Sequence, residues 1–361
     1  MNTEIKPATQ ERMLSIDFFR GFTMFLLISG IGGLFNPAST NKIISLIGIQ
    51  LDHAEWSGLN FWDLIQPFFM FIVGVSMPFS FSKRWERGDS WNKTFLSALR
   101  RSLLLLLLGW AISSTDTYST FTNVLAQLSF TYLVAFLIMR KDVKWQLVIS
   151  FALIIFTDII YRYWNVEGFN QPFTADHNFG SWVDVVLTGH VSEDRWVAFN
   201  AIPTAAHTIW GVLAGKVLMS EWTQKRKISA LLIGGLIGVV IGYGLSAFIP
   251  IIKRTCTSSF IFVSGGWALM ALAFSYWLID GLKYKKLAFF FAVVGMNPLF
   301  IYLFTHSGGR EMLGAFAKPF IYRLFSWSSP QTIQAIMILV VTAMLWLICY
   351  FLYKKKLFIR I

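Results

Sequence analysis

Charged residues are scarce in this sequence of 361 residues: they make up 14%, where a typical soluble domain has about 25%. Hydrophobic residues make up 55% and aromatic residues 17%. This composition excludes the two or three soluble domains that the length alone would suggest. Several apolar runs reach the roughly 20 residues that a membrane-spanning helix needs. We therefore expect an all-α, polytopic membrane helix bundle.

Cysteine is also nearly absent, with only Cys256 and Cys349. The predicted spans put these two residues near opposite faces of the membrane, which excludes a disulfide between them. Neither has neighbours at metal-ligand spacing, so we expect no metal site. The sequence also lacks a useful internal repeat, which weakens the case for a transporter built from two inverted halves.

A removable leader is a further feature that the sequence lacks. The first apolar run has no small-residue cleavage site and carries Asp17 and Arg20 at its start, which indicates a retained span. We expect a cytoplasmic tail over residues 1–12 and a single transmembrane domain over residues 13–361.

Ten apolar runs predict membrane spans. A further segment, 311–327, is less apolar; we interpret it as an interfacial or re-entrant piece, with an eleventh span as the alternative. The predicted spans cover residues 14–35, 59–81, 95–112, 121–139, 146–164, 197–219, 228–250, 258–280, 286–306 and 332–353.

The basic residues predict the orientation of these spans. With a cytoplasmic N-terminus, 21 of the 31 Lys and Arg residues fall on the cytoplasmic side and 8 on the other, while Arg20 and Lys216 lie within spans. The positive-inside rule therefore favours an N-in, C-in topology in a lipid bilayer. The net charge of +12 mainly reflects this topology and does not indicate nucleic-acid binding.

His53 and Asp63 form the most informative pair of residues. His53 precedes the second span on its outer side, and Asp63 lies within that span near Pro67. A carboxylate at bilayer depth costs roughly 2.5–3.5 kcal/mol or more, which makes Asp63 a functional-site candidate. The alternative is a structural hydrogen bond to a neighbouring helix.

Basic residues at the inner ends of spans have two interpretations each. Arg20 lies three residues after Asp17, so the two can neutralise each other, or Arg20 can meet an anionic ligand from the cytoplasm. Arg100 and Arg101 can be snorkelling anchors, or they can form a phosphate-binding entrance, because guanidinium groups suit bidentate phosphate contacts.

Polar residues elsewhere near membrane depth add weaker candidates. Asn178 and His190 lie in a long outer loop with several tryptophans, which can form a sugar-binding surface or an interfacial aromatic belt. Asn200 lies seven residues before His207, for which we expect interhelical hydrogen bonding. Asn297, followed by Pro298, breaks the ninth span, and such a break is typical of a helix that lines a cavity.

Several blocks of the sequence together resemble the transmembrane heparan-α-glucosaminide N-acetyltransferase family and its bacterial relatives. The resemblance extends from about residue 12 to the end, and the block around His53 is its most specific part. The blocks are LSIDFFRG at 14–21, HAEWSG at 53–58 with Asp63 and Pro67, FIVG at 71–74, NAIP at 200–203, GVLAG at 211–215, TSSF at 257–260, YWLID at 276–280 and GMN at 295–297.

This resemblance implies a ten-helix acyltransferase in the cell inner membrane. The donor would be cytoplasmic acetyl-CoA, and the acceptor an amino sugar of the glucosamine type on the far side. His53 matches the catalytic histidine of the family, and Glu55 and Trp56 beside it are candidate acceptor contacts. Homodimers are common among membrane enzymes of this kind.

The expected chemistry fits these positions. Acetyl transfer to an amine needs a base for the departing proton, and histidine suits that task near neutral pH. Asp63 would orient the imidazole. Arg20, Arg100, Arg101 and Asn297 would hold acetyl-CoA, whose pantetheine arm would pass through the bundle towards His53.

Two alternatives stay open at this point. His53 acts either as a general base in a ternary complex, which we favour, or as the carrier of a transient acetyl group. A protein of another class, a proton-coupled amino-sugar permease, would use the same intramembrane acid and broken helix.

Overall fold

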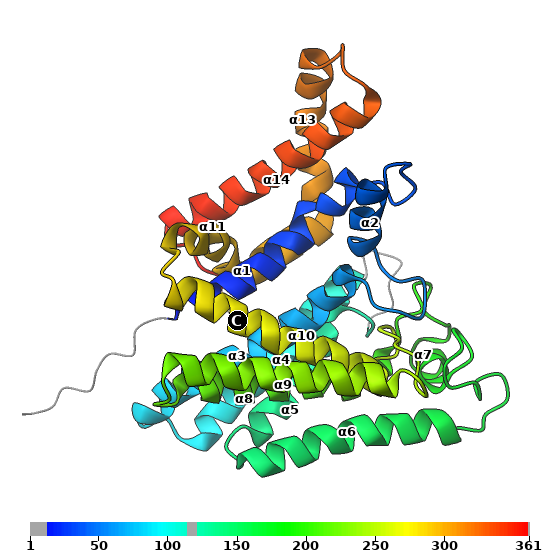
Figure 1. Ribbon diagram of the computed structural model, residues 1–361, viewed down its shortest axis with the longest axis vertical. Coiled ribbons are helices and arrows are strands. Elements are labelled where there is room, and N and C mark those ends of the chain that lie inside the picture. The colour runs from blue at the N-terminus through cyan, green and yellow to red at the C-terminus, as the bar shows by residue number, and fades with distance from the viewer. Residues whose placement is uncertain (1–12, 114–120, 360–361) are drawn as a thin grey trace, which may run out of the picture.

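The computed structural model describes residues 13–113 and 121–359, and every regular element within them is helical. Residues 1–12, for which we predict a cytoplasmic tail, lie outside the described residues. Figure 1 shows long helices that run roughly side by side, with a helical hairpin projecting at one corner. The α-helices are α1 (Leu14–Ser29), α2 (Lys42–Gln50), α3 (Ile65–Glu86), α4 (Trp91–Ser113), α5 (Val124–Ile138), α6 (Val143–Tyr163), α7 (Phe179–Thr188), α8 (Ala201–Met219), α9 (Gln224–Leu245), α10 (Ser258–Tyr276), α11 (Lys285–Gly295), α12 (Pro298–Phe304), α13 (Arg310–Leu324) and α14 (Pro330–Lys354).

Each of the ten predicted spans contains a long helix or a helix pair, which confirms the all-α class. The predicted number of about ten spans is not confirmed. Among the described residues, six helices are long and apolar enough to cross a membrane, or seven if the bent pair formed by α11 and the run from α12 to α13 counts as one span. α1 and α5, with 16 and 15 residues, are shorter than the roughly 20 residues that a span needs.

The ninth predicted span is broken where the sequence predicts it. α11 ends at Gly295, and α12 begins at Pro298 after a bend of 57°. A π-type turn, η5 (Thr305–Gly309), then leads directly into α13, so the less apolar segment 311–327 continues the second half of the broken helix. α13 packs against α14, and the two form the projecting hairpin of Figure 1.

α3 is the central helix of the bundle. Its Met70, Phe71 and Ile72 side chains are fully buried. α3 and α8 approach so closely that a Cβ atom on Gly74 would lie 2.1 Å from the backbone oxygen of Thr208. Small residues of this kind let transmembrane helices pack backbone to backbone. The helix that carries the predicted site at its start is thus fixed by its neighbours.

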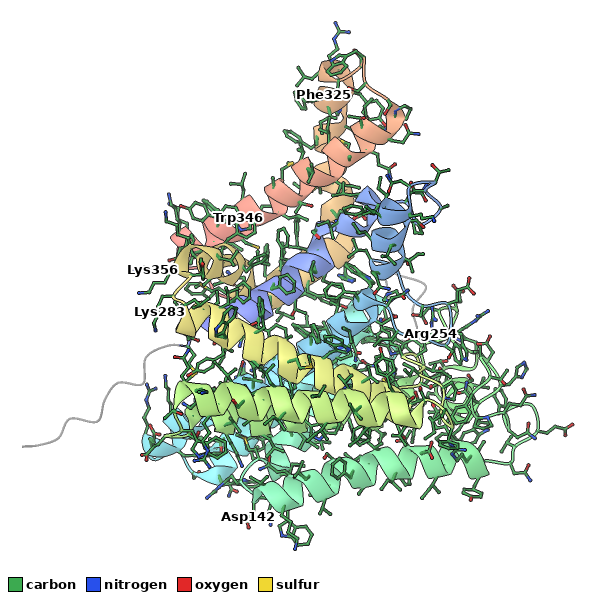
Figure 2. All side chains as sticks on the ribbon, in the orientation of Figure 1. Asp142, Arg254, Lys283, Phe325, Trp346 and Lys356 are labelled. Carbon is green, nitrogen blue, oxygen red and sulfur yellow. The ribbon has the colours of Figure 1, made fainter. Side chains whose placement is uncertain are left out.

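The labelled charged residues separate the two ends of the bundle. Asp142, Lys283 and Lys356 lie at one end, and Arg254 lies at the other (Figure 2). Arg254 donates hydrogen bonds to the backbone of residues 54 and 55. The loop that carries His53 is therefore at the end opposite the lysine-rich loops, as the predicted topology requires.

Candidate active site

Asp63 is held in the short helical turn η2 (Phe61–Leu64) that leads into α3. Its Oδ2 accepts hydrogen bonds from the backbone N–H groups of Ala54, at 3.2 Å, and Asn60, at 3.0 Å. Its Oδ1 lies 2.8 Å from His53 Nδ1, which is the contact that the sequence predicts. Only 1% of Asp63 is exposed, so this buried carboxylate fixes the loop of His53 against the start of α3.

His53 faces the outside of the bundle. Its side chain is 43% exposed, while its Nδ1 is turned to the Asp63 carboxylate. With Asp63 accepting the Nδ1 proton, Nε2 carries the lone pair of the neutral ring. This tautomer is the one in which an imidazole takes a proton from an incoming group at Nε2.

Lys253 completes the cluster and was missed by the sequence reasoning. Its Nζ lies 3.5 Å from Asp63 Oδ1 and 3.2 Å from His53 Nδ1, and 5.1 Å above the centre of the Trp196 ring. Burial lowers the pKa of Lys253 to about 8, although the Asp63 charge acts in the opposite direction. One signal could have found it: Lys253 and Arg254 form a basic pair in a short outer loop, against the positive-inside trend.

Arg254 ties three outer segments together. Its Nη1 donates to the Ala54 oxygen at 3.2 Å and to the Glu55 oxygen, and its Nε donates to the Asp194 oxygen at 2.8 Å. These contacts bring the loop before α10, the loop of His53 and the loop after α7 to one place. The side-chain cluster therefore depends on parts of the chain that are about 200 residues apart.

The predicted acceptor contacts have different environments. Glu55 and His190 are exposed at the surface, and Trp56 is half-buried with its Nε1 donating to the Phe173 oxygen at 2.7 Å. Asn178 is buried: it caps α7 through the N–H of Ser181 and donates to the Thr174 oxygen. The fold thus uses both polar atoms of the Asn178 side chain.

Asn200 is likewise buried inside the protein. Its Nδ2 donates to the Arg254 oxygen at 2.9 Å, and its Oδ1 accepts from Gln127. Through this contact Asn200 holds the loop of Lys253 in place, and its side chain is not exposed at the surface. His207, seven residues later, makes the expected interhelical contact, with Nε2 2.9 Å from Ser264 Oγ of α10.

A cavity of about 1010 Å³ opens between α1, α3, α4, α5 and the α11–α12 break. Four basic residues, Arg20, Lys83, Arg84 and Arg101, line it together with the acidic Asp17. Lys83 and Arg84 lie in the last turn of α3, at the end of that helix away from Asp63. The cavity therefore carries an excess of positive charge from residues of three helices.

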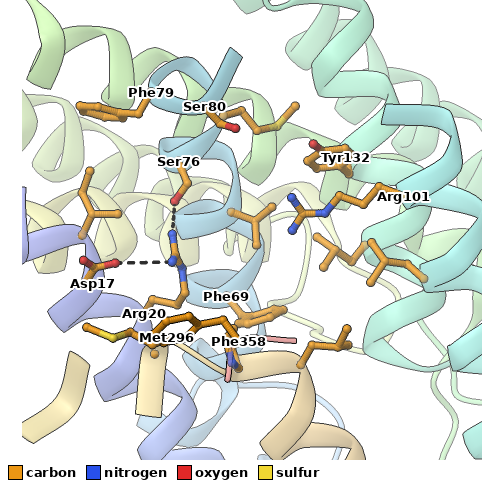
Figure 3. A pocket seen from close by; sticks show the side chains of 18 of the residues that line it. Asp17, Arg20, Phe69, Ser76, Phe79, Ser80, Arg101, Tyr132, Met296 and Phe358 are labelled. Atoms are coloured by element: carbon orange, nitrogen blue, oxygen red, sulfur yellow. Dashed lines mark hydrogen bonds and ion pairs between the residues drawn. The ribbon is translucent and has the colours of Figure 1, made fainter. Parts of the chain in front are cut away.

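Arg20 makes the ion pair that one of its two interpretations predicts, and it also lines the cavity. Arg20 forms an ion pair with Asp17 at 3.6 Å and contacts Ser76 Oγ, and it still lines the cavity (Figure 3). Arg101 lies on the opposite wall, 4.7 Å from the centre of the Tyr132 ring. Arg100 is exposed and does not line the cavity.

The α11–α12 break lines the cavity through Met296 and Pro298. Asn297 itself is buried and holds the C-terminal segment, since its Nδ2 donates to the Leu357 oxygen and its Oδ1 accepts from the Ile359 N–H, both at 3.0 Å. The broken helix thus lines a cavity, as predicted. The Asn297 side chain holds the C-terminal segment that forms part of one wall of this cavity.

The cavity stops short of the outer cluster. Among the described residues its outermost contact on α3 is Phe69, and neither His53 nor Asp63 lines it. Phe69 lies six positions after Asp63, or about 9 Å along a helix axis. The cavity therefore does not reach His53, and the continuous passage that we expected from the sequence is not found among the described residues.

The described parts of the chain contain no group of three or more His, Cys, Asp or Glu residues that could hold a metal ion. The chemistry that the described residues offer is a buried aspartate, an exposed imidazole and a buried amine at one end of the bundle. At the other end they offer a basic cavity. This combination suits proton transfer at the outer end and the binding of an anion from the inner end.

A family model described as heparan-alpha-glucosaminide N-acetyltransferase, catalytic, matches residues 12–245. Two curated relatives carry the name heparan-alpha-glucosaminide N-acetyltransferase: the Mus musculus protein is 25% identical over 99% of this chain, and the Homo sapiens protein is 23% identical over 100% of it. The chain spans 62% of the length of each.

Proposed function

Because this chain belongs to the heparan-alpha-glucosaminide N-acetyltransferase catalytic family, we propose that it is a membrane-embedded acetyltransferase. It takes acetyl groups from cytoplasmic acetyl-CoA and transfers them to the amine of a glucosamine-type sugar on the extracytoplasmic side of the inner membrane. The observation that carries this proposal is the His53–Asp63 contact of 2.8 Å at the bundle end opposite the lysine-rich loops. A homodimer stays a prediction from the resemblance.

His53 is the proposed general base. The neutral amine of the sugar attacks the thioester carbonyl, and His53 Nε2 accepts the proton that the amine loses. The tetrahedral intermediate then collapses with cleavage of the C–S bond. The leaving thiolate takes up the proton from the imidazolium, so the histidine returns to its neutral form.

Asp63 and Lys253 are the charged side chains that contact the imidazole. Asp63 orients the ring and stabilises the imidazolium that forms during transfer, as a carboxylate does in other base–orienter pairs. Lys253 offsets the charge of Asp63 from 3.5 Å. At the same end, Glu55, Trp56 and His190 are the proposed acceptor contacts; Asn178 and Asn200 support the fold around them.

The basic cavity is the proposed donor site. Guanidinium groups bind phosphate in a bidentate manner, and Arg20 and Arg101 lie on facing walls of the cavity. Lys83 and Arg84 add positive charge at the end of α3. The nucleotide phosphates would bind there, and the pantetheine arm would extend along α3 towards Asp63.

The first test removes the base. Purified His53→Ala protein in detergent should lose acetyl transfer from acetyl-CoA to glucosamine by about 100-fold or more, which is the usual scale of general acid–base catalysis. It should keep its acetyl-CoA affinity, because His53 does not line the cavity. His177→Ala is the matched control, since this outer histidine is engaged with the Gly168 oxygen at 2.9 Å.

Three outcomes would contradict parts of the proposal. Full activity of His53→Ala would exclude a catalytic role for His53. Isolation of acetylated His53 from protein incubated without acceptor would replace direct transfer by a covalent intermediate. Uptake of labelled sugar into vesicles without acetyl-CoA, together with no product in detergent, would favour the permease.

A further inference from the structure

Three buried amide side chains form a hydrogen-bonded chain beside the basic cavity, which we call the amide chain. Gln66, Gln127 and Asn200 are 6%, 0% and 0% exposed. Gln66 Nε2 donates to Gln127 Oε1 at 2.9 Å, and Gln127 donates in turn to Asn200 Oδ1. Asn200 Nδ2 donates to the Arg254 oxygen, so this amide chain reaches from α3 through α5 to the loop of Lys253.

The position of the amide chain follows from its neighbours in the sequence. On α3, Gln66 lies three residues after Asp63 and three residues before Phe69, which lines the cavity. On α5, Gln127 lies between Leu125 and Leu128, which also line the cavity. The Gln66–Gln127 contact therefore lies next to the cavity, although neither amide lines it.

Within this amide chain, Gln66 Oε1 is buried and has no hydrogen-bond partner among the described residues. A buried acceptor without a partner costs about 1–3 kcal/mol, which a donor on a ligand would recover. Gln66 can only accept at this atom, so the group that would satisfy it is an N–H or O–H donor.

We propose that Gln66 is a positioning residue for the acyl-pantetheine arm of the donor, and that its Oε1 accepts a hydrogen bond from a secondary amide N–H of that arm. This inference rests on the proposed function, because it assigns a contact to the donor. Pantetheine carries secondary amides along an otherwise apolar chain, and an amide N–H is the donor that a buried carbonyl lacks. An arm that reaches Gln66 from the cavity is one helical turn from Asp63.

The amide chain also connects the arm to the outer loop. Asn200 holds the backbone of Arg254, and Arg254 holds the backbone of Ala54 and Glu55 beside His53. Binding of the arm at Gln66 would therefore fix the amide chain that holds the loop of Lys253 and Arg254. Binding of the donor and the position of His53 are linked through this one set of hydrogen bonds.

The test compares two ligands on one variant. Gln66→Leu should weaken binding of CoA by about 10-fold, the scale of one buried hydrogen bond. It should leave binding of adenosine 3′,5′-bisphosphate unchanged, because this ligand has the nucleotide phosphates but no pantetheine. Isothermal titration of detergent-purified protein measures both dissociation constants, and the catalytic efficiency with acetyl-CoA should fall in parallel with CoA affinity.

Gln146→Leu is the matched control. Gln146 on α6 is also buried and also has an Oε1 without a partner among the described residues, but, unlike Gln66, it has no cavity-lining residue within three positions in the chain. It should leave the ratio of the two dissociation constants unchanged. If Gln66→Leu does not fold, Gln66→Met, with a flexible apolar side chain of similar length, takes its place.

The outcomes separate the two proposals. Unchanged CoA affinity in the Gln66 variant, or equal weakening of both ligands, would overturn the pantetheine contact and leave the proposed function standing. Loss of the transferase function itself would appear in the wild-type protein, as a failure to bind acetyl-CoA or to form product.

Discussion

Lys253 lies 200 positions from His53 in the chain, yet their nitrogen atoms are 3.2 Å apart. Asp63 contacts both side chains, so its carboxylate offsets the charge of the ammonium group. Asp52 accepts from the backbone N–H of His53. At the scale of single residues, the imidazole thus has a carboxylate and an ammonium group as side-chain neighbours.

The Lys253→Met variant tests this balance. Removal of the cation takes away the charge that offsets Asp63 and the contact with His53 Nδ1. The catalytic efficiency should therefore fall by about 10-fold, the scale of one interaction with a charged group. A kinetic assay with acetyl-CoA and glucosamine measures this loss.

Lys253→Arg is the control, since it keeps the positive charge and should keep the catalytic efficiency near that of the wild type. An unchanged catalytic efficiency in Lys253→Met would show that the charge of Lys253 has no part in the reaction.

At the scale of elements, α3 connects the two functional regions. Asp63 precedes its first turn, Gln66 lies in that turn, and Lys83 and Arg84 lie in the last. A single rigid helix thus spans from the outer cluster to the mouth of the cavity. Its position depends on close contact with α8, so the packing of these two helices sets the distance between donor and base.

The Gly74→Ala variant tests that packing. The added Cβ would lie 2.1 Å from the Thr208 oxygen, so α3 and α8 must move apart. Overpacking of this kind costs about 1–3 kcal/mol, and thermal unfolding in detergent should shift to lower temperature by several degrees.

Gly244→Ala on α9 is the matched control, because no atom lies within 4 Å of the added Cβ. It should leave the unfolding temperature unchanged or raise it, since alanine favours a helix over glycine by about 0.5–1 kcal/mol. Equal effects of the two substitutions would contradict the role assigned to the α3–α8 contact.

At the scale of the whole molecule, the proposal requires the two bundle ends to face different compartments. Lys355 lies just after α14, at the end with Lys283, and Glu193 lies in the loop that Arg254 holds at the other end. Acetyl-CoA is available in the cytoplasm, so the basic cavity must open there and His53 must face away.

Cysteine labelling tests this orientation. Glu193→Cys should react with a membrane-impermeant maleimide in right-side-out vesicles, and Lys355→Cys should react only in inverted vesicles. Cys256 and Cys349 are both buried and free, so the background should be low. The reverse labelling pattern would place His53 in the cytoplasm and contradict the proposed transfer across the membrane.

Much of the architecture could be predicted from the sequence because apolar runs act locally. Each run of membrane length forms a helix near its predicted bounds, and the Asn297–Pro298 pair breaks one of them where the backbone bonding is interrupted. The His53–Asp63 contact was also predictable, since the two residues are only ten positions apart. The predicted number of about ten spans is not confirmed. Short helices such as α1 are largely buried by their neighbours and are shorter than the apolar run in the sequence suggests.

Hydropathy and short-range spacing are properties of the chain, so they were enough to predict the class of protein, its helices and the histidine–aspartate pair. The fold alone brings Lys253 to this pair, places Arg20 and Arg101 but not Arg100 on one cavity, and uses Asn178 and Asn200 to hold its own segments. Those outcomes depend on which helices become neighbours. Helix packing is governed by side-chain shape at contacts such as Gly74 and Thr208, which lie far apart in the sequence.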